Sequence, residues 1–145
     1  KFKHPNVNDL VRVMEKESGL ELDWYKEYFV YSTKTIDYAV KEVKASEEGT
    51  SITLERVGAM PMPVDLVITY KDGTKELVYL PLEIMRGEKK LEANAPSLVL
   101  SQDWPWTHPT QTINLKRAMD SIKSVEIDPS KRMADVQVEN NKVEF

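Results

Sequence analysis

The chain has 145 residues, of which 41% are hydrophobic and 30% are charged, a composition typical of a globular protein with a core of its own. Its 20 Lys and Arg residues are scattered among 24 Asp and Glu residues, and the net charge is -4. Because nucleic-acid binding needs a clustered basic surface, we expect no nucleic-acid partner. There is no cysteine, which excludes disulfide bonds and thiolate chemistry.

No apolar run approaches the roughly 20 residues that cross a bilayer, so we expect no membrane span. The chain begins with Lys1 and shows no charged-then-apolar leader. We therefore interpret it as an excised or processed piece of a longer protein.

Two helices are predicted near the amino end. Asn6 and Asp9 have the spacing of an N-cap and an acidic first turn, and Gly19 is placed to end the first helix as a left-handed C-cap. The residues between these caps include four apolar side chains at helical spacing: Leu10, Val11, Val13 and Met14.

The second predicted helix begins near Asp23 and is rich in aromatic residues. Trp24, Tyr28 and Tyr31 are expected on one face. Tyr25 and Phe29 form an i, i+4 pair on another. One partner surface cannot cover so many aromatic rings, so we expect burial on more than one side, as for an inner helix of a larger body, or coverage by a second copy in a homodimer.

From residue 36 onward the hydrophobic period becomes that of strands. Apolar side chains fall at every second position from Val64 to Tyr70, Pro61 and Pro63 precede that strand, and Asp72-Gly73 predicts a hairpin turn. Other strands are expected at about 36–44, with a bulge near residue 43, and at 52–58, 75–82, 98–100, 112–116 and 124–127.

About seven short strands without intervening helical patterns indicate a mainly β protein. We predict an antiparallel Ig-like β-sandwich preceded by a short two-helix segment. The expected organisation is a helical segment over residues 1–34 and a sandwich domain over residues 35–145.

No catalytic, cofactor or metal site is predicted within the chain. A catalytic zinc ion needs about three protein ligands, whereas the only histidines are His4 and His108 and no H-E-x-x-H motif is present. His108 with Asp103 is one alternative metal pair, but His108 is more typical of a loop residue bonded to the backbone. The chain also lacks G-x-S-x-G and the glycine-rich phosphate loops.

Two tryptophans, Trp104 and Trp106, lie between prolines and allow two interpretations. If both rings face water, they and His108 would form a surface for sugars or extended peptides. If both face inward, they close one end of the sandwich. Alternation places the two rings on the same side, and a small sandwich needs large residues to fill its core, which favours the buried arrangement.

Three stretches, in this order, together resemble one protein family. Residues 4–19 read HPNVNDLVRVMEKESG and continue to Leu22-Asp23-Trp24-Tyr25; residues 60–65 read MPMPVD and run into Lys71-Asp72-Gly73-Thr74; residues 125–129 read VEIDP and precede Asp135 and Asn140-Asn141. These stretches resemble the C-terminal region of bacterial zinc aminopeptidases of the aminopeptidase N type, the gluzincin aminopeptidases.

The resemblance implies that catalysis belongs to another domain of the parent protein and not to this chain. In that family a zinc-activated water and a glutamate base in H-E-x-x-H remove single residues from peptide N-termini. No zinc ligand or general base of the family matches a position here, so zinc is expected only in the missing catalytic domain of the parent. The resemblance also suggests an exported protein, in the periplasm or at the cell surface.

The leading hypothesis is therefore a non-catalytic C-terminal fragment that braces the catalytic domain of its parent chain. The expected contact residues are the aromatic residues of the second helix: Trp24, Tyr25, Tyr28, Phe29 and Tyr31. The alternative is a free-standing β-sandwich module that binds glycans or peptides through Trp104 and Trp106.

Overall fold

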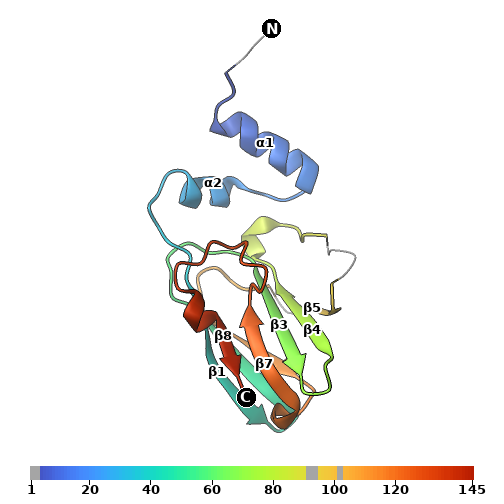
Figure 1. Ribbon diagram of the computed structural model, residues 1–145. Helices are drawn as coiled ribbons and strands as arrows, with labels where there is room; N and C mark the ends of the chain where they lie inside the picture. Colours follow the sequence, from blue (N-terminus) through green and yellow to red (C-terminus); the bar gives the residue numbers. More distant parts are fainter. Residues whose placement is uncertain (1–3, 91–94, 101–102) are drawn as a thin grey trace.

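A computed structural model describes residues 4–90, 95–100 and 103–145 of the chain (Figure 1). Two helices, α1 (Val7–Ser18) and α2 (Asp23–Phe29), lie together at one end of a two-sheet β body. The prediction of a mainly β sandwich preceded by two short helices is confirmed.

The predicted caps of α1 are both present. The Asn6 side chain accepts hydrogen bonds from the main-chain N–H groups of Asn8 and Asp9, and the Asp9 carboxylate accepts the Asn6 N–H at 3.1 Å. Gly19 has φ 73°, a left-handed conformation that glycine adopts without a Cβ clash. These contacts satisfy main-chain groups that a helix leaves free at its ends.

One sheet has three strands and the other has five. The first has the order β1 (Tyr38–Ser46), β2 (Gly49–Arg56) and β6 (Thr110–Leu115). The second has the order β5 (Ser97–Leu100), β4 (Lys75–Leu80), β3 (Val64–Tyr70), β7 (Ile122–Ile127) and β8 (Lys142–Glu144). Short 3-10 turns lie at Glu83–Met85, Met119–Ser121 and Val138–Asn141.

Among the described strands, every pair is antiparallel except one. β5 runs parallel to β4, pairing Glu76 with Ser97 at the edge of the five-stranded sheet. β1 has an irregularity between Val40 and Glu42, close to the predicted bulge. The described residues thus contain eight strands, one more than the approximate number expected.

The core lies between the two sheets. On β3 the inward side chains of Val64, Leu66, Ile68 and Tyr70 are fully buried, as their alternation predicts. They pack with residues from the opposite sheet that are also buried: Tyr38, Val40, Ile52, Leu54, Ile113 and Leu115. The outward positions of β3, Asp65 and Val67, are therefore left for contacts on the other side of that sheet.

The central hairpin closes as predicted at Asp72-Gly73, where Gly73 has φ 84°. The Asp72 carboxylate accepts hydrogen bonds from the side chain and the main chain of Thr74 and from Arg117. The Arg117 guanidinium also lies over the Tyr70 ring, 3.6 Å from its centroid. These contacts tie the hairpin to the segment that follows β6.

Candidate functional site

The outer side of α1 exposes apolar side chains to solvent. Leu10, Val13 and Met14 are 59%, 56% and 42% exposed, whereas Val11 is buried. Residues at i, i+3 and i+4 share one face of a helix, so the three exposed side chains form a stripe. A helix of a globular protein normally buries such a stripe.

The aromatic residues of α2 divide into a half-buried group and an exposed group. Tyr25 and Tyr28 are half-buried and pack against the core of the sandwich, and burial raises the pKa of Tyr25. Phe29 is 56% exposed and stacks on Tyr25 with ring centroids 5.0 Å apart, which confirms the predicted i, i+4 pair. Trp24 is half-buried, with its ring edge-on to Tyr25 at 5.8 Å.

The expectation that Trp24, Tyr28 and Tyr31 share one helical face was wrong for Tyr31, because α2 ends before it. α2 ends at Phe29 because the chain turns away immediately afterwards: the Ser32 hydroxyl donates to the Tyr28 carbonyl at 2.5 Å and replaces a continuing helical bond. Tyr31 lies beyond the helix and is 58% exposed.

Specific contacts attach the helices to the rest of the molecule. The Glu21 N–H donates to the Met85 carbonyl at 2.9 Å, which joins the α1–α2 connection to the turn after β4. The Glu15 carboxylate accepts the Leu22 N–H at 2.9 Å and holds the two helices together. α2 therefore rests on the sandwich, while the outer stripe of α1 is left uncovered.

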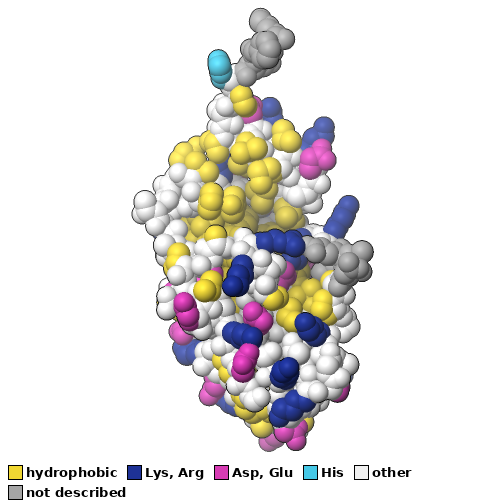
Figure 2. Space-filling model, viewed as in Figure 1, with side chains coloured by type: hydrophobic (Ala, Val, Ile, Leu, Met, Phe, Trp, Pro, Cys, Tyr) yellow, Lys and Arg dark blue, Asp and Glu magenta, His cyan; other side chains and the backbone are white. Residues whose placement is uncertain are grey.

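These observations define an apolar surface at the helical end of the molecule. Figure 2 shows hydrophobic side chains gathered over this end, whereas acidic and basic side chains are interspersed over the sandwich. We call it the apolar helical surface; its exposed members are Leu10, Val13, Met14, Phe29, Val30 and Tyr31. Exposed apolar patches of this kind mark contact sites for another body.

Trp104 and Trp106 do not form a pair, which corrects the expectation that their rings lie on the same side. Trp104 is buried: its main-chain N–H donates to the Pro81 carbonyl at 2.8 Å, and its ring is edge-on to the Tyr38 ring, with centroids 5.3 Å apart. Trp106 is 38% exposed. Strand alternation fails here because residues 105–108 form a turn, closed by the His108 N–H bonding the Pro105 carbonyl.

His108 is an exposed residue of that turn, and Asp103, which precedes the turn, is exposed as well. The His108 carbonyl accepts the Trp104 indole N–H at 3.0 Å. This bond from the indole to a main-chain carbonyl orients the buried tryptophan ring. A platform that needs both tryptophan rings is therefore not built in this structure.

Trp106 instead lines the same surface hollow as Trp24, which comes from a distant part of the chain. Both line a surface hollow of about 440 Å³ between α2 and the turn after β4, together with Glu21, Asp23, Glu83, Ile84 and Arg86. The sequence around Trp24 or Trp106 did not predict this hollow, because the hollow depends on how the helices pack against the sandwich.

Three carboxylates lie together where α1 meets α2. Oxygen atoms of Glu15, Glu21 and Asp23 are within 4.8 Å of one another. Two of these groups have partners already: Glu15 accepts the Leu22 N–H, and Asp23 pairs with Lys26 at 2.6 Å and thereby raises the lysine pKa. We interpret the cluster as part of the joint between the helices.

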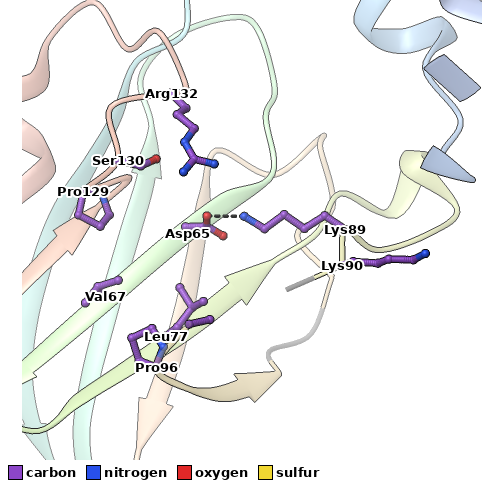
Figure 3. Close-up of a pocket in the computed structure, with 10 residues that line it drawn as sticks. Asp65, Val67, Leu77, Lys89, Lys90, Pro96, Pro129, Ser130 and Arg132 are labelled. Carbon is purple, nitrogen blue, oxygen red and sulfur yellow. Dashed lines mark hydrogen bonds and ion pairs between the residues drawn. The ribbon is translucent and has the colours of Figure 1, made fainter. Parts of the chain in front are cut away.

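A second hollow, of about 440 Å³, lies on the outward face of the five-stranded sheet (Figure 3). Its floor comes from β3 and β4, and its walls come from the segments after β4 and after β7. Neither its position nor its lining was predicted from the sequence, since the alternation from Val64 to Tyr70 indicates only which side chains of the strand face the core. We call it the sheet pocket; it is lined by Asp65, Val67, Leu77, Lys89, Lys90, Ala95, Pro96, Pro129, Ser130 and Arg132.

Comparison with known proteins gave no match to any family model, curated protein or solved structure. None of the described helices has the length and apolar character that a membrane-spanning helix needs.

Proposed function

We propose that this chain is a non-catalytic C-terminal fragment of a zinc aminopeptidase-like protein and that it braces the parent's catalytic domain. The observation that carries the proposal is the apolar helical surface. An exposed stripe on α1, together with the exposed residue Phe29 at the end of α2 and Val30 and Tyr31 after it, supports contact with a further protein body.

The proposal names the catalytic domain of the same parent chain as that body. It rests on the resemblance of three ordered sequence stretches to the C-terminal region of zinc aminopeptidases. In such an arrangement the helices form part of the interface between two domains, and the sandwich supports the helices from the other side. Tyr25 and Tyr28 fit this role because they pack against the sandwich, while Phe29 beside them stays exposed.

The proposal is tested by separating the two parts of the parent. The polypeptide encoded upstream of residue 1 is expressed alone and titrated with this chain by calorimetry. We expect a one-to-one complex. The double variant Leu10→Glu/Met14→Glu should weaken it at least a hundredfold, because two acidic groups would have to be buried without partners.

A matched control uses the same kind of change elsewhere. Val57 and Val136 are 57% and 60% exposed on the sandwich, so Val57→Glu/Val136→Glu adds the same charge outside the helical surface and should leave binding unchanged. Self-association of the isolated chain, abolished by the α1 variant, would contradict the proposal and favour a homodimer. Stoichiometric zinc binding by this chain, or release of amino-acid anilides, would also contradict it.

A further inference from the structure

Three segments of the chain form the hollow between α2 and the turn after β4, and main-chain hydrogen bonds join them. The Glu21 N–H donates to the Met85 carbonyl at 2.9 Å, which joins the connection between the helices to the turn after β4. The Trp104 N–H donates to the Pro81 carbonyl at 2.8 Å, which holds the turn that carries Trp106 against the same segment. We call this site the tryptophan hollow; its walls are attached to one another before any ligand binds.

Trp24 offers the hollow an aromatic ring but no hydrogen-bond donor. Its indole N–H already donates to the Glu21 carbonyl at 2.7 Å, and its ring is edge-on to the Tyr25 ring, with centroids 5.8 Å apart. Both contacts hold the ring in place. Because the only polar atom of the indole is already bonded, Trp24 can contact a ligand only through its apolar ring surface.

Trp106 brings a second ring from the turn of residues 105–108. It is 38% exposed although it is a large aromatic residue, and it forms no ring contact with Trp24 or with any other aromatic residue that the structure describes. An indole has only two side-chain torsions, so ordering it on a ligand costs little conformational entropy. The two rings that line the hollow are therefore not stacked on each other and can both contact a ligand.

The polar side chains around the rings supply acceptors and a donor. In the described part of the chain, the Glu21 and Glu83 carboxylates and the Arg86 guanidinium form no side-chain hydrogen bond or ion pair. The Asp23 carboxylate, in contrast, is paired with Lys26 at 2.6 Å. A ligand in the hollow thus meets two carboxylates that accept hydrogen bonds and one guanidinium that donates them.

This combination favours a neutral ring with several hydroxyl groups over a charged ligand. A cation would meet Arg86 and an anion would meet Glu21 and Glu83, whereas a hydroxyl group can donate to a carboxylate and accept from a guanidinium. The C–H groups of a pyranose ring form an apolar patch that can pack on an aromatic ring. The volume of the hollow, about 440 Å³, lies within the range of small-molecule sites.

We propose that the tryptophan hollow binds a pyranose sugar. Trp24 and Trp106 contact the C–H surface of the sugar. Its hydroxyl groups donate to Glu21 and Glu83 and accept from Arg86. None of these residues belongs to the apolar helical surface, so the inference is independent of the docking role proposed for the helices.

The test titrates the whole chain with cellobiose, a disaccharide of two flat pyranose rings, and follows the indole N–H signals by NMR. We expect saturable shifts of the Trp24 and Trp106 signals, with the signal of the buried Trp104 unchanged. Sorbitol offers hydroxyl groups without a ring, and tetramethylammonium offers a positive charge without hydroxyl groups. Each should bind about tenfold more weakly than cellobiose, or weaker still.

Two variants with matched controls test the individual contacts. Trp106→Ala should weaken cellobiose binding by about tenfold, because it removes one of the two rings. Glu83→Gln should weaken it by about fivefold, because a neutral amide accepts a weaker hydrogen bond than a carboxylate. Tyr31→Ala removes an exposed ring outside the hollow, and Glu88→Gln removes an exposed charge of the same segment outside it; each should change the affinity by less than about twofold.

Equal binding of cellobiose and sorbitol would overturn the proposal, as would tighter binding of tetramethylammonium than of cellobiose. An unchanged affinity in Trp106→Ala, or the absence of saturable shifts, would overturn it as well. If Trp106→Ala fails to fold, the comparison of Glu83→Gln with Glu88→Gln and that of the three probes on the natural chain still decide the question.

Discussion

The Tyr38 hydroxyl forms two hydrogen bonds with a single residue, Met62. It donates to the Met62 carbonyl at 3.0 Å and accepts the Met62 N–H at 2.8 Å. Tyr38 opens β1 in the three-stranded sheet, and Met62 lies between the two prolines that precede β3 in the other sheet. One side chain thus fixes the start of both layers of the sandwich.

Replacement of Tyr38 by phenylalanine should destabilise the chain by about 2 kcal/mol, because it leaves two main-chain groups of Met62 without their partner. The free energy of unfolding in urea, measured by circular dichroism, checks this value. Tyr31→Phe is the control, since Tyr31 is 58% exposed and should give a change within about 0.5 kcal/mol. Equal stability of the two variants would contradict the role given to Tyr38.

The stability of the chain should depend on pH through the Asp72 carboxylate in the central hairpin. Hydrogen bonds from the Thr74 side chain and main chain, and from Arg117, lower the pKa of Asp72 from 3.8 to about 2. A carboxyl group whose pKa is lower in the folded state stabilises the fold above its unfolded pKa, and this contribution disappears as the pH falls through the folded value. The contribution should therefore be complete above about pH 4 and vanish toward about pH 2.

The Asp72→Asn variant tests this window. It keeps a carbonyl oxygen for the turn and removes the charge. The difference in unfolding free energy between the natural chain and the variant should shrink as the pH is lowered from about 5 to about 2. A constant difference across this range would show that the hairpin does not depend on the ionised carboxylate.

Truncation should destabilise the chain far more at Trp104 than at Trp106. Trp104→Ala removes a buried ring that packs on Tyr38, so it should cost about 3–5 kcal/mol. Trp106→Ala removes an exposed ring and should cost less than about 0.5 kcal/mol. Urea unfolding measures both values, and acrylamide quenching of the remaining fluorescence should be stronger when Trp106 is retained than when Trp104 is retained.

Local chemistry made several features predictable from the sequence. The caps at Asn6 and Gly19 use side-chain and backbone properties of a few neighbouring residues, and the Asp72-Gly73 turn does the same. The alternation from Val64 to Tyr70 predicted which side chains of β3 are buried. These patterns require no knowledge of distant parts of the chain.

Features that depend on distant contacts were missed. The sheet pocket joins Asp65 to Lys89 and Arg132, and no short motif links these positions. The parallel pairing of β5 likewise depends on the route of the chain after β4. The expectation that Trp104 and Trp106 point to the same side was wrong because alternation applies only within a strand, and Trp106 lies in a turn.

The central claim, that another domain covers the apolar helical surface, is tested most directly by oxidative footprinting of Met14, the most exposed of the six methionines. Methionine oxidation follows solvent access, so hydrogen peroxide should oxidise Met14 readily in the isolated chain. In the complete parent protein we expect Met14 to be oxidised at least tenfold more slowly, with Met119, which lies on the turn before β7, unchanged. Equal oxidation of Met14 in the isolated chain and in the parent would contradict the account.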